Sequence, residues 1–197
     1  MYRAFFKRFI GCLLALLGLI VTCIPMLVIA IAIKLDSKGP IVFRQERLGK
    51  KQKIFTIYKF RTMVDHAYEI GGVAMRSDDV RITKVGALLR RTSLDELPQM
   101  INILKGDMAI IGPRPILPEE FEEYQENKEY YKRYEVLPGM FCTVDVKYRS
   151  SSDRDLQFKM DAEYADCLNF GLDVSTFFKI IIPVIKGKNV YRQEIRK

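Results

Sequence analysis

One uncharged run near the N-terminus constrains this chain more than any other feature. Residues 9–33, between Arg8 and Lys34, contain no Asp, Glu, Lys or Arg and are rich in Leu, Ile and Val. As a single helix, this run would be about 37 Å long, which exceeds the ~30 Å hydrocarbon core of a bilayer. It is also longer than the apolar part of a cleavable signal peptide, and no clear cleavage site follows it. We therefore expect residues 1–36 to form a membrane helix that stays in the protein.

The orientation of this helix is open because basic residues flank the run on both sides. A helix that simply spans a membrane usually carries its excess of cations on the cytoplasmic side. Pro25 lies inside the run, removes one helical hydrogen bond and is expected to bend the helix. Two arrangements remain: a kinked span with its more basic C-terminal side in the cytoplasm, or a re-entrant helix that enters and leaves on the cytoplasmic face. The flanking cations are Arg3, Lys7, Arg8, Lys34, Lys38, Arg44, Arg47, Lys50, Lys51 and Lys53.

Residues 37–197 are expected to form one compact domain. The turn cluster Asp36-Ser37-Lys38-Gly39-Pro40 marks its start. With 49% hydrophobic and 28% charged residues, the chain has enough apolar surface to fold rather than stay disordered. The pattern of apolar residues predicts an α+β fold, in which a small, mostly helical domain carries a short β-hairpin and helices at the membrane interface.

The expected elements follow from hydrophobic periodicity and turn residues. Strands are predicted over 41–45 and 53–60, joined as a hairpin through Leu48-Gly49-Lys50, and over 142–147. Helices are predicted over 82–89, 97–104, 118–133, 160–166 and 174–185, and residues 64–79 are predicted to form a helix followed by a loop. The segment 174–185 is very apolar, so it is either a core helix or one that lies on the bilayer surface.

The charge balance favours anionic partners. The net charge of +8 suits phosphate substrates, nucleic acid or an anionic membrane face. The cations flank the membrane run and a pair of carboxylates rather than forming an aromatic-interleaved surface, so we expect no nucleic-acid partner. Four cysteines without C-x-x-C spacing argue against a disulfide framework or a zinc site. The single histidine, His66, argues against a Ser-His-Asp triad.

The candidate site is the stretch Arg90-Arg91-Thr92-Ser93-Leu94-Asp95-Glu96-Leu97-Pro98-Gln99. Its residue types allow two interpretations. Ser93 and Glu96 have the spacing of a capping box that opens the helix over 97–104, with Gly106 as its stop. Alternatively, Asp95 and Glu96 bind a hard cation such as Mg²⁺ while nearby arginines hold phosphate oxygens. The pattern by itself favours capping.

Three further cations are candidates for phosphate contacts. Lys59 and Arg61 stand at the exit of the second predicted strand, where solvated side chains are an equally good explanation. Arg114 lies between two prolines in Gly112-Pro113-Arg114-Pro115, which restricts its backbone.

Taken together, these motifs resemble those of the bacterial sugar transferases known as small monotopic phosphoglycosyl transferases. The resemblance covers nearly the whole chain. Its recognisable pieces are the stretch 90–99, the Pro-locked Arg114, and two further segments. These are Tyr58-Lys59-Phe60-Arg61-Thr62-Met63 and Asn102-Ile103-Leu104-Lys105-Gly106-Asp107-Met108. Each piece alone is a weak signal, but the combination is highly specific and reverses the preference for a capping box.

The resemblance implies a reaction and a place. Such enzymes move a sugar 1-phosphate from a UDP-sugar to polyprenyl (undecaprenyl) phosphate and release UMP, as the first membrane step of polysaccharide or glycoconjugate assembly. The family's carboxylate dyad falls on Asp95, as nucleophile and Mg²⁺ ligand, and on Glu96, which positions the metal or assists proton transfer. Arg114, Lys59, Arg61 and Arg149 would bind substrate phosphates.

The resemblance also implies a re-entrant helix broken at Pro25. The catalytic domain would then lie on the cytoplasmic face of the bacterial inner membrane, in contact with membrane lipids. The oligomeric state stays open, a homo-oligomer included.

Departures from the family pattern cluster after residue 137. The usual Pro-Gly-Ile-Thr-Gly and Ala-Gln-Val become Pro138-Gly139-Met140-Phe141-Cys142 and Val144-Asp145-Val146, and Arg149 alone is kept from Gly-Arg-Asn. Ile24 also replaces the usual Ser before the helix-breaking proline. These changes leave the identity of the sugar open. A membrane-anchored basic binding or scaffold protein without turnover is the alternative function.

Overall fold

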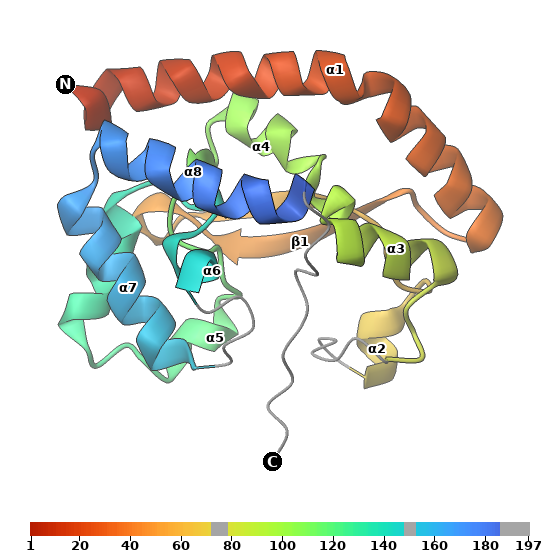
Figure 1. Ribbon diagram of the computed structural model, residues 1–197. Coiled ribbons are helices and arrows are strands. Elements are labelled where there is room, and N and C mark those ends of the chain that lie inside the picture. Colours follow the sequence, from red (N-terminus) through yellow and green to blue (C-terminus); the bar gives the residue numbers. More distant parts are fainter. Residues whose placement is uncertain (72–78, 148–152, 186–197) are drawn as a thin grey trace.

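The computed structural model describes residues 1–71, 79–147 and 153–185, in a mixed helical and stranded architecture (Figure 1). Its α-helices are α1 (Lys7–Asp36), α2 (Ala67–Gly71), α3 (Lys84–Thr92), α4 (Gln99–Lys105), α5 (Glu119–Glu122), α6 (Thr143–Lys147), α7 (Arg154–Cys167) and α8 (Phe170–Ile185). The strands are β1 (Val42–Leu48), β2 (Ile54–Phe60), β3 (Ala109–Ile111) and β4 (Gly139–Phe141). Short turns of other helix types are η1 (Tyr2–Phe6), η2 (Lys50–Gln52), η3 (Leu94–Glu96) and η4 (Lys128–Glu135).

Helix α1 has the length and composition of a membrane helix. It is 30 residues long, contains Pro25, and is the one described helix apolar enough to cross a bilayer. Only 6% of its most apolar window is buried inside the protein, so most of its side chains face outward. The helix runs along one edge of the molecule and bends toward its C-terminal end (Figure 1).

A stripe of small residues lets α1 pack closely against α4. Ala15 is buried, and Gly11 and Gly18 lie one turn to either side of it on the same helical face. A Cβ atom on Gly18 would stand 2.6 Å from the sulfur of Met100 on α4, and one on Gly11 would be 3.8 Å from Ile103. A Cβ at Gly18 would therefore require the Met100 side chain to move, whereas one at Gly11 would make an ordinary van der Waals contact.

Both ends of α1 are tied to the same folded domain. Near its start, Lys7 Nζ donates to Asp173 on α8, and to the hydroxyl of Tyr164 on α7 at 2.7 Å. At its end, the carboxylate of Asp36 accepts a hydrogen bond from the backbone N–H of Val85 at 2.9 Å. The two ends of this long helix thus contact helices that follow far along the chain.

The predicted hairpin is confirmed, with a first strand that is longer than the sequence suggested. β1 and β2 pair antiparallel from Val42 opposite Phe60 to Leu48 opposite Ile54. The fully buried Asn102 of α4 joins this hairpin to the helical layer. Its side chain accepts from the backbone N–H of Tyr58 at 3.0 Å and donates to the carbonyl of Thr56 at 2.7 Å. Because both bonds are to β2, they fix the position of α4 along the hairpin.

The predicted strand over 142–147 is wrong. Residues 139–141 form strand β4, and the residues from Thr143 to Lys147 form helix α6. β4 pairs in parallel with β3, and the two backbones approach very closely at Gly112 and Gly139. A Cβ on Gly139 would lie 2.1 Å from the backbone nitrogen of Gly112. This close approach of β3 and β4 needs glycine on both sides. The residues before 142 supply Gly139, so they pair with β3, and the alternating segment 142–147 does not.

The continuous charged helix predicted over 118–133 is also wrong. The chain forms only α5, a turn, and η4, because the aromatic residues of this segment pack inward around the fully buried Phe158 of α7. The ring of Tyr124 meets that of Phe158 edge-on at 4.8 Å, and Phe121 lies 5.8 Å from it. The predicted helices near 82–89, 97–104, 160–166 and 174–185 are present as α3, α4, α7 and α8 with shifted ends.

Candidate functional site

Ser93 does not cap α4, and its position before η3 carries no side-chain capping bond. It adopts the left-handed conformation, with φ of 57°, at the C-terminus of α3. Thr83 caps α3 instead, where its hydroxyl accepts from the N–H of Gly86 at 3.0 Å. The reversal at Ser93 starts η3 and carries Asp95 and Glu96 toward the interior. α4 then begins after Pro98 and ends at Gly106, in agreement with the predicted stop.

Asp95 and Glu96 occupy different electrostatic environments. Asp95 is 8% exposed, and burial together with repulsion from Glu96 raises its pKa to about 6. Burial alone would raise the pKa of Glu96 too, but attraction by Lys59 and Arg114 outweighs it and lowers that pKa. Lys59 Nζ donates to Glu96 Oε1 at 2.9 Å. The pair therefore combines one carboxylate whose charged form is favoured by neighbouring cations with one whose charged form is disfavoured by burial.

Arg114 reaches the same site from the loop after β3. This loop is held against β4, because the N–H of Gly139 donates to the carbonyl of Pro113 at 2.8 Å. The guanidinium of Arg114 is half-exposed and lies 3.4 Å from a carboxylate oxygen of Asp145 on α6. A cation with an accessible fork beside two carboxylates is suited to hold a phosphate oxygen close to Asp95.

A buried ion pair fixes the backbone of Arg114. Arg133 donates to Asp161 Oδ2 at 2.8 Å, and the two side chains are only 1% and 0% exposed. Arg133 also donates a hydrogen bond to the carbonyl of Arg114 at 2.6 Å. The backbone N–H of Arg114 in turn lowers the pKa of Asp161, although burial dominates and raises that pKa to about 6. The peptide groups on both sides of Arg114 are thus engaged by a single buried pair.

The structure brings together four of the predicted site residues: Lys59, Asp95, Glu96 and Arg114. Arg61 does not contact these four residues through its hydrogen bonds. Its buried guanidinium donates instead to the carbonyls of Ser37 and Lys38, just past α1. These bonds fit a role in positioning the end of α1, and its predicted phosphate contact stays a prediction. Arg149 lies outside the described residues.

Sequence reasoning missed Asp145 and Gln99 as members of the site. Asp145 is the ion-pair partner of Arg114, and burial together with repulsion from Glu96 raises the pKa of Asp145. The side chain of Gln99 hydrogen-bonds Glu96. Asp145 stands where the family pattern has Gln, and that departure was the one available signal. Arg90, in the predicted stretch, donates to the hydroxyl of Thr62 at 2.9 Å and contributes positive charge near Asp95.

Comparison with known proteins identifies the family. A family model described as bacterial sugar transferase matches residues 2–187 of the 197. The chain belongs to the bacterial sugar transferase family. The resemblance inferred from the motifs is therefore confirmed, and Asp95, Glu96 and Arg114 all lie within the part of the chain that the family model covers.

Three relatives of this bacterial sugar transferase show the range of its similarity. A UDP-N-acetylgalactosamine-undecaprenyl-phosphate N-acetylgalactosaminephosphotransferase of Aeromonas hydrophila is 36% identical over 93% of this chain, but over only 44% of its own length. The exopolysaccharide production protein PSS of Rhizobium leguminosarum bv. phaseoli is 35% identical over 92% of this chain and 96% of its own. A putative undecaprenyl-phosphate N-acetylgalactosaminyl 1-phosphate transferase of Bacillus subtilis is 44% identical over 60% of this chain and 66% of its own. The chain thus spans less than half of one of these relatives and nearly all of another.

The carboxylates of this family member fit a metal ion that arrives with a substrate better than one that is permanently bound. Among the residues described, no three His, Cys, Asp or Glu side chains are grouped as a metal cage. Mg²⁺ is commonly held by one or two carboxylates together with substrate phosphates and water. Asp95, which is buried and has no ion-pair partner in the described part of the chain, would be the residue to supply such a carboxylate.

The raised pKa of Asp95 predicts a pH-dependent stability difference between the wild type and Asp95→Asn. Asp95 favours its neutral form when folded, so this stabilisation is complete below about pH 4 and is lost as pH rises through about 6. Asn imitates the neutral acid at every pH. In EDTA at pH 7.5, the mutant should therefore melt about 3–8 °C above wild type, and the difference should vanish near pH 4. Thermal unfolding in detergent across this range measures it; equal melting temperatures at pH 7.5 would contradict the raised pKa.

Proposed function

We propose that this protein is a phosphoglycosyl transferase that moves a sugar 1-phosphate from a UDP-sugar to polyprenyl phosphate. The observation that carries the proposal is the buried Asp95, which has no ion pair among the described residues and lies beside a Glu96 that is paired with Lys59 and attracted by Arg114. The names of the Aeromonas and Bacillus relatives, which include undecaprenyl phosphate, agree with this reaction.

In the first half of the proposed reaction, a carboxylate oxygen of Asp95 attacks the sugar-bearing phosphorus. A bond from Asp95 to that phosphorus forms, the diphosphate bond breaks, and UMP leaves with the electron pair. The salt bridge to Lys59 keeps Glu96 occupied, so that Asp95 is the carboxylate free to attack. Arg114 would hold an oxygen of the diphosphate in line with it.

In the second half, an oxygen of polyprenyl phosphate attacks the same phosphorus and breaks its bond to Asp95. The carboxylate is regenerated and the product is a polyprenyl diphosphate sugar. Glu96, which Lys59 and Arg114 hold ionised, lies beside Asp95 and would position the metal or assist the transfer of a proton that the acceptor phosphate carries. When bound at Asp95, Mg²⁺ would neutralise negative charge on the diphosphate and so assist the departure of UMP.

The contacts of α1 support a re-entrant helix rather than a span. Lys7 and Asp36, at the two ends of α1, are both hydrogen-bonded to the domain that carries Asp95. Contacts from both ends of one helix to the same domain support entry and exit on a single face of the bilayer. Exposed apolar side chains on the neighbouring helices, among them Leu88 of α3 and Phe178 of α8, would extend the membrane contact. We therefore place the domain on the cytoplasmic face of the bacterial inner membrane, where UDP-sugars are present.

The proposal is tested by UMP release from detergent-solubilised protein with polyprenyl phosphate, Mg²⁺ and a panel of UDP-sugars. UDP-N-acetylgalactosamine is the first donor to try, since two of the relatives are named for that sugar. Donor-dependent UMP release that EDTA abolishes is expected. Without acceptor, mass spectrometry should find one sugar phosphate attached to the peptide that contains Asp95. Release of UMP that is unaffected by EDTA would contradict the role of Mg²⁺, and no release with any donor would favour a binding or scaffold protein.

A further inference from the structure

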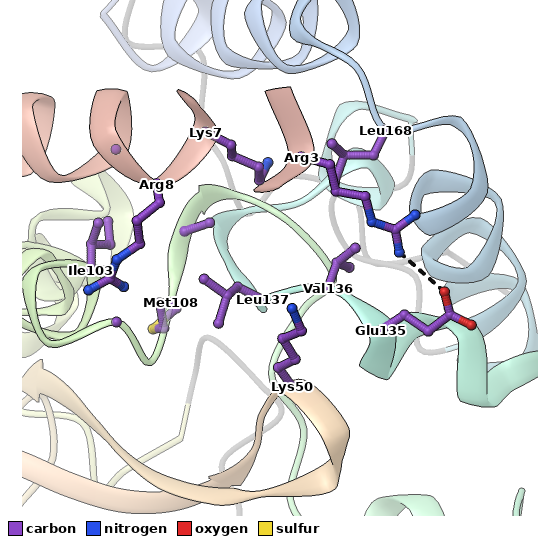
Figure 2. Close-up of a pocket in the computed structure, with 13 residues that line it drawn as sticks. Arg3, Lys7, Arg8, Lys50, Ile103, Met108, Glu135, Val136, Leu137 and Leu168 are labelled. Carbon is purple, nitrogen blue, oxygen red and sulfur yellow. Dashed lines mark hydrogen bonds and ion pairs between the residues drawn. The ribbon is translucent and has the colours of Figure 1, made fainter. Parts of the chain in front are cut away.

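A second cationic cavity lies apart from the Asp95 site, beneath the N-terminal end of α1 (Figure 2). Its volume is about 270 Å³, and its lining comes from η1 and α1, the turn between β1 and β2, the C-terminal end of α4, and the segment around Val136. Lys59, Asp95, Glu96 and Arg114 are not among its lining residues. The proposed transfer reaction therefore leaves this cavity without a function.

The cavity has an excess of positive charge. Its charged lining residues are Arg3, Lys7, Arg8, Lys50 and Glu135. Two of the cations are neutralised, because Arg3 pairs with Glu135 at 3.2 Å and Lys7 pairs with Asp173. Within the described residues, neither Arg8 nor Lys50 has a carboxylate partner. Figure 2 shows the Lys50 amine rising into the cavity from the hairpin turn and Arg8 entering from α1.

Arg8 is held in a position from which it can still bind an anion. One of its guanidinium nitrogens donates to the carbonyl of Leu104 at 3.3 Å, near the C-terminal end of α4. The same guanidinium lies over Gly106, where a Cβ atom would come within 2.2 Å of it. This fixes the guanidinium plane with a single neutral acceptor and leaves further N–H donors, so a phosphate can be held bidentately.

The rest of the lining indicates an amphiphilic ligand rather than a soluble ion. The walls include apolar side chains, among them Met108, Leu137 and Leu168. Close in the chain to the cavity residues Arg3, Lys7 and Arg8, the aromatic residues Phe5 and Phe6 of η1 and Phe9 of α1 are exposed. Cations next to exposed aromatic and aliphatic side chains are typical of the level at which lipid headgroups meet acyl chains.

We propose that this cavity binds the headgroup phosphate of an anionic membrane lipid between Arg8 and Lys50, with the acyl chains along the exposed face of α1. A lipid bound there joins α1 to the hairpin turn. In the described part of the chain, neither the Arg8 nor the Lys50 side chain makes a bond that connects these two elements. This site is separate from the Asp95 site and does not depend on turnover, so it can be measured in the full-length Asp95→Asn protein.

The test compares two adjacent lysines. In detergent-solubilised Asp95→Asn protein, binding of dioctanoyl phosphatidylglycerol is measured by native mass spectrometry and by titration, with Lys50→Gln, Arg8→Gln and Lys51→Gln added singly. Lys51 is the matched control, because it is exposed and has the same charge but does not line the cavity. Lys50→Gln and Arg8→Gln should each weaken binding about tenfold, whereas Lys51→Gln should change it less than about twofold.

Three results would overturn the proposal. Equal losses with Lys50→Gln and Lys51→Gln would mean that the lipid responds to general positive charge alone. Equal competition by inorganic phosphate would mean a site for a soluble anion, without a contribution from the apolar walls. Equal affinity for dioctanoyl phosphatidylcholine, which carries no net charge, would show that the two cations do not select the ligand.

Discussion

Replacing Asp95 with Asn is expected to abolish UMP release while leaving the fold at least as stable as in the wild type. Asn fills the same space but cannot form the bond to phosphorus, so the rate should fall by at least about 10³-fold. Because burial disfavours the charge of Asp95, removing that charge should raise stability rather than lower it. Steady-state UMP release and thermal unfolding of the same preparation measure both effects.

Glu163→Gln is the matched control for this loss. Glu163 lies on the exposed face of α7, and the same change from carboxylate to amide there should leave both turnover and stability within a small factor of wild type. If Asp95→Asn kept wild-type turnover, Asp95 would not be the nucleophile. If the variant unfolded at a lower temperature than wild type, the loss of turnover would have to be assigned to folding instead.

The second large effect is expected at the buried pair of Arg133 and Asp161. Asp161→Asn leaves the Arg133 guanidinium buried without its counter-charge, which should destabilise the protein by about 3–5 kcal/mol. The neighbouring residue supplies a close control: Lys132 pairs with Asp166 at 2.7 Å, but these side chains are 41% and 52% exposed. Asp166→Asn should therefore change stability by less than about 1 kcal/mol. Thermal or denaturant unfolding of the two variants shows whether burial, rather than the short distance that both ion pairs share, decides the loss of stability.

Exchange of both partners for apolar residues separates stability from positioning. Arg133→Met with Asp161→Leu should recover much of the stability that Asp161→Asn loses, since no buried charge is left unpaired. It should still impair turnover, because the bond from Arg133 to the carbonyl of Arg114 is gone. Recovery of both stability and turnover would show that the pair does not position Arg114. Equal destabilisation by Asp161→Asn and Asp166→Asn would remove burial as the cause.

Several features of this protein followed from local sequence patterns. The uncharged run between Arg8 and Lys34 is long enough to be recognised by composition alone, and it became α1. Alternation in residues 53–60 predicted β2, and Gly106, which adopts a positive φ of 94°, ended α4 as expected. These features depend on residues that are neighbours in the chain, which is why periodicity and turn chemistry find them.

Local patterns failed where a distant partner decided the outcome. Ser93 and Glu96 have capping-box spacing, but the Glu96 carboxylate accepts a hydrogen bond from Lys59 of β2. Ser93 adopts the left-handed conformation and ends α3. The segment 142–147 alternates like a strand, yet β3 pairs with the residues just before it, at the closely packed Gly112 and Gly139.

Sequence patterns were enough to identify the long apolar helix, the hairpin, and the family to which Asp95 and Glu96 point. The electrostatics of the site depend on the tertiary fold. Lys59 and Glu96 are 37 residues apart, and whether they meet depends on how α4 docks against β2 through Asn102. The opposite pKa shifts of two adjacent carboxylates follow from that docking, since charge interactions depend on separation and burial in space rather than on order along the chain.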